Sequence, residues 1–364
     1  MTSLLFELFS EEIPARMQVR AAEQLRDLLG EVITSEGLAW QEARVFATAR
    51  RLALTAHGLP LVQADRPIER KGPRVGAPQA AMDGFLRSLG DVDYRLEERA
   101  EKKGEAVYAL YTAKGRSTAE ILGEALPNLL AKFPWPKSMR WGDGDARWVR
   151  PLQAIVCLLD GEIVPFAFAG IDAGRTTFGH RFMAPDAIEI SGADDYRPQL
   201  EAAYVMLDGA QRRELIAERA SLIASQQGLV LRNDPGLLRE LEGLAEWPVL
   251  LLGAIDPQFM DLPAEVLVIS MRSHQKYLAL ETADGALAAR FIIVANIEAK
   301  DGGAAIIAGN ERVLRARLWD AKFFWDRDLK KPLEERLPAL ENMVFQAELG
   351  TLREKVERIE RLAA

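Results

Sequence analysis

The residues best suited to chemistry are clusters of positive charge, because arginine and lysine neutralise phosphate while neighbouring aromatic rings stack on bases. A third cluster, late in the chain, also carries four carboxylates, which favour ion pairs within a helix. We therefore expect phosphate contact at the first two clusters before the third. The clusters are Arg66, Arg70, Lys71 and Arg74; Lys137, Arg140, Arg147 and Arg150 with Trp141 and Trp148; and Arg312, Arg315, Arg317, Lys322, Arg327, Lys330 and Lys331.

Two of the three histidines extend this pattern. His180 lies in RTTFGHRF and His274 in MRSHQKY, each near a basic and an aromatic residue. The alternative interpretation is that both are ordinary polar residues at the end of a strand or helix. Together these segments predict a phosphate-facing, RNA-binding set. The set is Arg70, Lys71, Arg74, Arg140, Arg150, His180, Arg181, His274 and Lys276.

The motifs of common catalytic sites are missing from the sequence. It contains no GxxxxGK[ST], GxGxxG, GxSxG, HExxH or CxxC pattern. The histidines are far apart, so a histidine-based metal site is not expected, while one built only from carboxylates stays open. The single cysteine, Cys157, lies in the apolar run AIVCLLD and is expected to be a buried, inert thiol. We assign no catalytic residue, metal ligand or cofactor to this chain.

An acidic pair near the start, Glu11 and Glu12, has two interpretations. The alternating segment Ser3 to Phe9 predicts a strand, and the stretch from Pro14 to about Gly37 predicts a helix. Ser10 is then expected to cap that helix, and the two glutamates suit its positive N-terminal end. Capping is favoured over a catalytic carboxylate pair.

Length and composition describe a folded protein of more than one domain. Single cores stop growing near roughly 250 to 300 residues, and this chain has 364. It is 49% hydrophobic and 27% charged, with no signal-peptide pattern and no apolar run near the roughly 20 residues of a membrane helix. We expect a cytoplasmic protein that contacts neither membrane nor DNA. The net charge of −8 means that RNA binding must come from local patches.

Helix and strand patterns mix without a regular βαβ repeat, which predicts an α+β fold. In the first part we expect strands at 43–47 and 52–57, a basic loop at 65–78, a helix near 80–89, a hairpin of 94–99 with 106–112, and a helix from 118 to about 133. Further strands are expected at 154–159, 163–169, 176–182, 248–252 and 291–296, with helices at 211–227 and 264–274.

Domain boundaries follow from breaks in this pattern. Two prolines within Lys132–Pro136 mark the first break, and strand signals cease from about Gly303. The predicted domains are an N-terminal α+β domain at 1–133, a β-rich α+β domain with an inserted helix at 134–302, and a helical segment at 303–364.

The last segment is expected to be entirely helical. Phe345, Leu349, Leu352, Val356 and Ile359 recur at alternating spacings of four and three, as on one face of a helix. That helix has no glycine or proline stop, so the natural protein is expected to continue. Earlier in the segment, a group of large aromatics is expected in the core rather than stacked on bases. The group is Trp319, Phe323 and Phe324.

Motifs along the whole chain resemble those of one known protein family. The first is the opening LLFELFSEEIPARM, and the others follow in order: ATARRLAL, ERKGP, MRWG with VRP, GHRFM, EWPVLL, PAEVLVISMRSHQKYLAL, FIIVANIEAKD, GNERVLRARLWDAKFFWDRDLK and FQAELGTLREKVERI. These motifs resemble those of the β subunits of bacterial two-subunit glycyl-tRNA synthetases, whose opening is LLxEIxxEELP. Phe9 and Ser10 replace the usual Gly-Thr of the family, and Leu278 stands where the family more often has phenylalanine.

This resemblance implies a tRNA-binding subunit of an α2β2 ligase. In such an enzyme the α subunit binds ATP, Mg²⁺ and glycine, and the β subunit holds glycine tRNA. The resemblance further implies that this chain is non-catalytic, that helical (HD) and anticodon-binding domains would follow it, and that its architecture is similar to the tail and body domains of archaeal CCA-adding enzymes.

Two other functions stay open at this stage. One is a structural platform that assembles the α subunits and makes little RNA contact in this part of the chain. The other is an RNA enzyme in its own right, a metal-dependent nucleotidyltransferase or hydrolase, which would need clustered carboxylates in a cleft.

Overall fold

The computed structural model describes residues 2–101 and 104–364 and is a mixture of helices and mainly antiparallel sheets, so the predicted α+β class is confirmed. The chain forms two compact units. The first contains Met1–Arg212 together with Glu242–Trp247, and the second contains Arg213–Leu241 and Pro248–Ala364. The chain therefore leaves the first unit, returns to it for six residues, and leaves it again.

The predicted boundaries at 133/134 and 302/303 both fall inside these units. The first falls inside because strand β7 (Leu152–Leu159) pairs with the N-terminal strand β1 (Ser3–Ser10). The second falls inside because Leu314 and Leu318 of helix α8 (Ala304–Leu329) share a core with Phe291.

The centre of the first unit is a seven-stranded sheet in the order β2-β3-β1-β7-β10-β9, with β8 paired to β7. All of its pairs are antiparallel except β10 with β7. Its other strands are β2 (Glu42–Ala47), β3 (Arg51–His57), β8 (Glu162–Ile163), β9 (Ala167–Phe168) and β10 (Ile171–Gly174).

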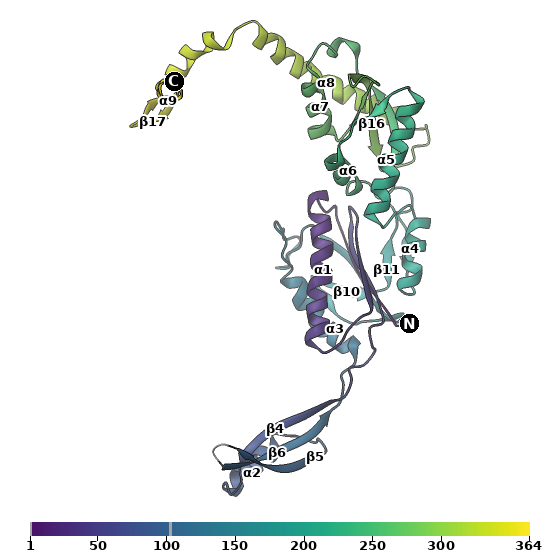
Figure 1. Ribbon diagram of the computed structural model, residues 1–364. Coiled ribbons are helices and arrows are strands. Elements are labelled where there is room, and N and C mark those ends of the chain that lie inside the picture. Colours follow the sequence, from purple (N-terminus) through teal and green to yellow (C-terminus); the bar gives the residue numbers. More distant parts are fainter. Residues whose placement is uncertain (1, 102–103) are drawn as a thin grey trace. The chain divides into compact units, whose positions relative to one another are not determined.

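Strand β1 is buried on both faces because helices cover both sides of the sheet (Figure 1). Leu4, Phe6 and Leu8 pack with helices α1 (Ala15–Ser35) and α3 (Thr118–Ala131). Leu5 faces the other way, toward helix α4 (Ala193–Ala202). This double burial places the one charged residue of the strand, Glu7, inside the protein. Strands β11 (Thr176–Phe178) and β12 (Ala187–Glu189) form a separate pair.

The expected cap of the first helix was wrong. Ser10 is the last residue of β1, it is buried, and its hydroxyl donates to the carbonyl oxygen of Glu11. Helix α1 begins one residue after Pro14, which is its N-cap and makes no side-chain cap hydrogen bond. The glutamates therefore precede the helix, where they are free to pair with other residues.

The basic segment 65–78, expected to be a loop, contains a strand. Strand β4 (Arg66–Arg74) pairs with β6 (Gly104–Ala113), which also pairs with β5 (Tyr94–Glu101), so the order is β4-β6-β5. Helix α2 (Gln79–Arg87) packs against β4 (Figure 1). Strand β4 is largely exposed on both faces, so it has no apolar alternation that would reveal it in the sequence. The predicted hairpin and short helix are confirmed.

The second unit has a four-stranded sheet in the order β13-β15-β16-β14. Helices α5 (Gly209–Gln226) and α6 (Pro235–Glu242) cover one face, and α7 (Ala264–Ser270) and α8 cover the other. Its strands are β13 (Val230–Leu231), β14 (Val249–Ala254), β15 (Leu278–Glu281) and β16 (Leu287–Ala295), with a short 3-10 turn at Pro257–Phe259 and a π-helical turn at Met271–Gln275.

The C-terminal segment was expected to be entirely helical, but the structure also has two short strands there. A 3-10 stretch (Leu333–Asn342) leads to the small pair β17 (Val344–Gln346) and β18 (Gly350–Thr351). Helix α9 (Leu352–Ala363) starts only at Leu352. Phe345 therefore lies on a strand and Leu349 in a turn, because Gly350 has a left-handed backbone that interrupts the helical spacing.

Two expectations about burial have opposite outcomes. Cys157 is fully buried in the central sheet, and burial raises the pKa of its thiol, as expected for an inert residue. The group Trp319, Phe323 and Phe324 was expected in the core, but these side chains are 50%, 60% and 59% exposed. In the described part of the chain, none of the helices combines the length and apolar character that crossing a bilayer requires.

Candidate nucleic-acid interface

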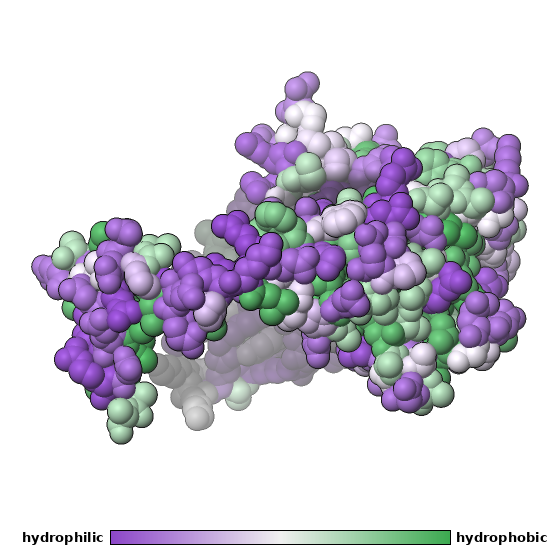
Figure 2. Space-filling view, turned by 90° about the horizontal axis from the view of Figure 1, so that it is seen from above, coloured by the Kyte–Doolittle hydropathy of each residue, from purple (hydrophilic) through white to green (hydrophobic). Residues whose placement is uncertain are grey.

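The nine residues predicted to face phosphate come from four segments of the chain, three in the first unit and one in the second. Arg70, Lys71 and Arg74 are exposed on strand β4. Hydrophilic residues cover most of the face seen in Figure 2, with groups of hydrophobic residues between them.

On β4 the positive charges are already engaged. The Lys71 ammonium lies 2.5 Å from Glu101, and the hydrogen bond with this carboxylate raises the pKa of Lys71. Arg70 donates to the carbonyl oxygen of Ser88 at 2.8 Å. A phosphate could replace Glu101 because the pair is exposed and water would solvate the displaced carboxylate. Arg74 is exposed at the end of the strand and offers a further cation.

Arg140 and Arg150 flank a bridge between Met139 and Trp148. Arg140 is exposed and pairs with Asp145 at 3.1 Å, while Arg150 is half-buried and donates to the carbonyl oxygen of Val149. Trp148 is fully buried and packs on Trp135 and Phe133, so it is a core residue rather than a base-stacking one. This stretch therefore presents the charges of Arg140 and Arg150, while Trp148 packs beneath them in the core.

His180 and Arg181 follow strand β11 and have different environments. His180 is fully buried, and its Nδ1 accepts the backbone N–H groups of Phe182 and Met183, each at 3.3 Å. It thus supports the loop from inside. Arg181 is exposed and pairs with Glu11 at 3.3 Å and Glu12 at 3.8 Å. The acidic pair of the sequence therefore binds an arginine rather than capping a helix.

In the second unit, His274 and Lys276 lie at the π-helical turn after α7. His274 is exposed, and Lys276 has a left-handed backbone with φ of 58° and pairs with Glu240 at 2.9 Å. The neighbouring Arg272 pairs with Asp234 at 2.5 Å. This turn presents cations that carboxylates of the same unit hold in place.

A hollow of about 300 Å³ lies beside Arg181. Arg50 lines it, and the Arg50 guanidinium stacks 4.5 Å above the Phe9 ring, which in turn stacks on Phe178 at 5.4 Å. The pKa of Arg50 is lowered, first by burial, although it remains a cation at neutral pH. Gln153 accepts from Arg50 and donates to Glu11, so the positive charge of this hollow is partly offset. The full lining is Phe9, Arg50, Gln153, Phe178, Gly179, Arg181 and Pro185.

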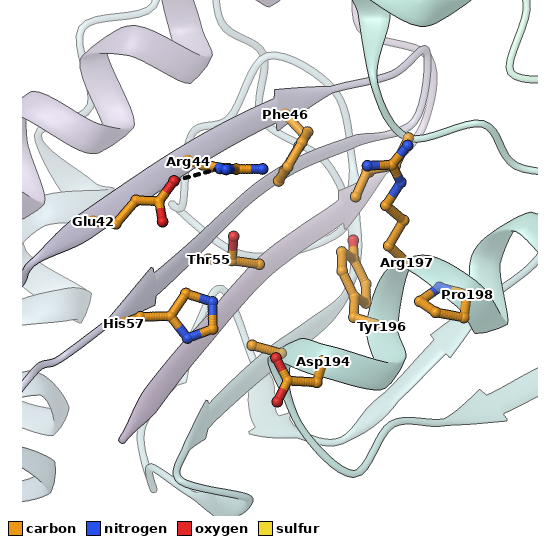
Figure 3. Close-up of a pocket in the computed structure, with 11 residues that line it drawn as sticks. Glu42, Arg44, Phe46, Thr55, His57, Asp194, Tyr196, Arg197 and Pro198 are labelled. Atoms are coloured by element: carbon orange, nitrogen blue, oxygen red, sulfur yellow. Dashed lines mark hydrogen bonds and ion pairs between the residues drawn. The ribbon is translucent and has the colours of Figure 1, made fainter. Parts of the chain in front are cut away.

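A second hollow, of about 390 Å³, lies between the sheet edge and α4 (Figure 3). Arg44 on β2 pairs with Glu42 at 2.6 Å, and His57 on β3 points into the same space. Asp194 and Arg197 of α4 line the opposite side. The hollow is ringed by both signs of charge, so it has the character of a polar surface groove rather than of an anion site.

Beneath these surfaces lies a network of buried charge that sequence reasoning missed. Glu7 accepts hydrogen bonds from the hydroxyls of Thr177 and Tyr196. Arg51, on the neighbouring strand β3, is fully buried and lies 3.6 Å from Glu246. The Glu246 carboxylate also accepts a hydrogen bond from the Thr48 hydroxyl at 2.6 Å. The only sequence signal for this network was a single glutamate inside the apolar run LLFELF.

The network fixes the loop that carries His180 and Arg181. Arg51 donates to the carbonyl oxygen of Phe178 at 2.9 Å, and Thr177 is tied to Glu7. Burial lowers the pKa of Arg51, but the carboxylates of Glu246 and Glu7 outweigh it, so the pKa is raised and the residue stays charged. A buried cation with carboxylate partners thus supports the loop from below.

A second buried arginine, Arg212, secures the segment Glu242–Trp247. Its guanidinium donates to the carbonyl oxygens of Glu242 at 2.7 Å and Ala47 at 2.8 Å. Two further bonds reach Met206 and Leu207. Burial lowers the pKa of Arg212 to about 10, which still leaves it protonated at neutral pH. The returning segment is therefore held by backbone carbonyls as well as by Glu246.

Within residues 2–101 and 104–364, no group of three or more histidine, cysteine, aspartate or glutamate side chains is placed to hold a metal ion. The carboxylate cluster that an independent RNA enzyme would need is thus not found in the described part of the chain. The arrangement supplies exposed, carboxylate-paired cations over a rigid interior, which suits reversible contact with a polyanion.

Comparison with known proteins identifies close relatives over the whole chain. The family model described as glycyl-tRNA synthetase beta subunit matches residues 4–364. The chain is 49% identical over 388 residues to the glycine–tRNA ligase beta subunit of Rhodospirillum centenum, and 48% identical over 370 residues to that of Paracoccus denitrificans. Each alignment covers 100% of this chain and 54% of the relative. The chain thus spans about half the length of these curated relatives.

Proposed function

The chain belongs to the glycyl-tRNA synthetase beta subunit family, and from that premise we propose that it binds and positions glycine tRNA for a glycine–tRNA ligase. The observation that carries this proposal is the continuous match over residues 4–364, with 46–49% identity to curated relatives that bear this name. The ATP-dependent joining of glycine to tRNA would occur on a different, α subunit, in a cytoplasmic α2β2 assembly.

The division of labour between subunits fits the chemistry of this chain. Its sequence lacks the common nucleotide-binding motifs, and its described residues offer cations rather than a nucleophile with an adjacent base. Positioning an RNA needs phosphate contacts and shape, not an activated side chain. ATP and Mg²⁺ would accordingly be bound by the α subunit.

The proposed RNA contacts are the exposed or half-buried basic residues of the four places described above. Most of them already contact a carboxylate or a backbone carbonyl oxygen of the protein. An RNA phosphate would have to displace these carboxylate or carbonyl partners, which weakens its binding to the basic residue. Weak binding suits a substrate that must leave after each turnover. His180 would act indirectly, by supporting the loop of Arg181. The contacts are Arg70, Lys71, Arg74, Arg140, Arg150, Arg181, His274 and Lys276.

The test is binding of the purified chain to glycine tRNA over a series of salt concentrations, with a non-cognate tRNA of similar length alongside. Affinity should fall steeply with salt as counterions are released. A preference for glycine tRNA would add recognition of shape or sequence. Absence of binding at low salt would contradict the proposal for this part of the protein and favour a platform for the α subunit.

A variant makes this test specific to the surface of β4. Reversing Arg70, Lys71 and Arg74 to glutamate should weaken tRNA binding and flatten its salt dependence. The matched control reverses three exposed cations elsewhere, namely Arg16, Arg20 and Arg26 of α1. Equal losses in the two variants would show a nonspecific charge effect and remove β4 from the interface.

A further inference from the structure

One exposed face of α8 carries a stripe of cations and aromatic rings. The successive spacings of its members are four, three, four, four and three residues, which keeps them on one side of a helix. All of them are exposed. We call this the α8 stripe, and its members are Arg312, Ala316, Trp319, Phe323, Arg327 and Lys330.

The aromatic rings of the stripe are exposed yet held in place. Trp319 is 50% exposed and packs edge-on against the buried Phe259, with ring centroids 5.4 Å apart. Phe323 is 60% exposed and packs edge-on against Phe324 at 5.4 Å. Large rings left half in water are costly unless a ligand covers them. Because the buried Phe259 fixes the orientation of Trp319, little entropy is lost when a ligand stacks on that ring.

The cations of the stripe are available to a ligand. In the described part of the chain, Arg312, Arg327 and Lys330 have no ion-pair partner, although carboxylates lie nearby. Those carboxylates are used elsewhere: Asp256 pairs with Arg315, Asp326 with Lys322, and Asp328 with Arg336. Asp320 is the remaining exposed acid of this helix. The stripe is therefore net positive and complementary to a polyanion.

We propose that the α8 stripe binds an RNA segment with unpaired bases. This inference rests on the proposed tRNA-binding function and names one surface that would contribute to it. Bases stack on Trp319 and Phe323, while the three cations neutralise phosphates on either side. From Arg312 to Lys330 the helix rises about 27 Å, enough for several nucleotides.

The composition of the stripe favours RNA over a protein partner. Its six members include three cations and no carboxylate, which complements a chain of phosphates. The exposed Leu329 and Leu333 lie outside the stripe, around a separate hollow of about 470 Å³. Aromatic rings between unpaired cations are the combination that single-stranded nucleic acids require.

The first experiment compares binding of the full chain to a short single-stranded oligouridine and to duplex RNA of the same length. The double variant Trp319→Ala with Phe323→Ala should weaken oligouridine binding at least about 30-fold, because each of the two lost stacks is worth about fivefold or more. The conservative variant Trp319→Phe with Phe323→Tyr should retain the affinity. The control Leu329→Ala with Leu333→Ala should also bind normally.

The second experiment separates charge from stacking. Arg312→Gln with Arg327→Gln should reduce the slope of log affinity against log salt by about 1.4, since each phosphate contact on a single strand contributes about 0.7. Arg16→Gln with Arg20→Gln removes the same charge from α1 and should leave the oligouridine slope unchanged. Circular dichroism of every variant confirms that it is folded.

The outcomes distinguish this inference from the proposed function. Unchanged oligouridine affinity in both stripe variants, with glycine tRNA still bound, overturns the stripe and leaves the proposed function standing. Unchanged RNA affinity with an altered elution volume on gel filtration overturns it in favour of a protein contact. If the unaltered chain binds oligouridine through the stripe but not glycine tRNA, the inference holds and the proposed function fails. Failure to bind either RNA contradicts both.

Discussion

The seven-stranded sheet of the first unit and the three-stranded sheet β4-β6-β5 use the same residue types in opposite ways. In the larger sheet, Arg51 of β3 pairs with Glu246 of the returning segment, both are fully buried, and Glu7 of β1 accepts from two hydroxyls. In the smaller sheet, Lys71 and Glu101 are exposed. A buried pair cannot exchange partners without leaving a charge in the core, whereas an exposed pair can. One sheet is therefore built for rigidity and the other for replaceable contacts.

The largest expected effect comes from removing a buried partner. Glu246→Ala would leave Arg51 charged in the core without its ion-pair partner, and should cost about 3–5 kcal/mol of unfolding free energy. Hydrogen-exchange mass spectrometry would show the loss in β1 and β3. The matched variant Glu101→Ala in the three-stranded sheet should leave β1 unaffected and change its own sheet far less. Similar losses in the two variants would erase the contrast between the sheets.

A smaller loss is expected from Tyr196→Phe. The variant keeps the ring but removes one of the two hydroxyl donors to the buried Glu7, which should cost about 1.5–3 kcal/mol. Denaturant unfolding monitored by exchange in α4 and β1 measures it. Tyr204→Phe, where the ring packs on Trp247, is the control and should be nearly neutral. A neutral Tyr196→Phe would mean that the hydroxyl contributes nothing to the network.

The exposed sheet should respond to acid. The hydrogen bond from Lys71 lowers the pKa of Glu101 below its usual 4.5. A lowered carboxyl pKa stabilises the folded state above that usual value, and the contribution is lost as the pH falls through the folded-state pKa. Exchange in β4–β6, corrected for intrinsic rates, should therefore accelerate as the pH falls below about 4.5. In Glu101→Gln this acceleration should be reduced; an identical pH profile would argue against the pair.

The smallest expected effect concerns RNA rather than stability. If Glu101 competes with phosphate for Lys71, then Glu101→Gln should strengthen glycine tRNA binding by roughly two- to fivefold at low salt, in the range of an exposed ion pair. The same logic applies to Glu11→Gln, which leaves Arg181 only its longer pair with Glu12. Fluorescence titration measures both variants. Weaker binding in either one would mean that the carboxylate orients its cation for phosphate instead of competing with it.

The sequence predicted helices and strands correctly where buried apolar residues recur at regular spacing along the chain. The helices α3 and α5 and the strands β7 and β16 pack one face or both against a core, and their apolar spacing indicated them. Strand β4 was not predicted because it buries few side chains and contains proline and glycine, which are typical of loops. The final helix was extended too far because Phe345 and Leu349 happen to continue its spacing.

The candidate site was less predictable than the fold, for two physical reasons. Exposed cations show in the sequence, but their partners come from distant segments, as with Arg181 and Glu11. Buried charges are single letters in apolar runs, and their compensation depends on tertiary contacts such as Arg51 with Glu246. The aromatic rings of α8 were placed in the core because helical spacing alone does not say which face meets the sheet.

The return of Glu242–Trp247 to the first unit bears on the order of events during synthesis. The ribosome releases the chain from its N-terminus, so Arg51 emerges long before residue 246. Until then the core of the first unit lacks the carboxylate that compensates this buried arginine, and Arg212 lacks the carbonyl of Glu242. The core of the first unit is therefore completed only after residues 242–247 have emerged. By then the stretch 213–241, which belongs to the second unit, is already outside the exit tunnel.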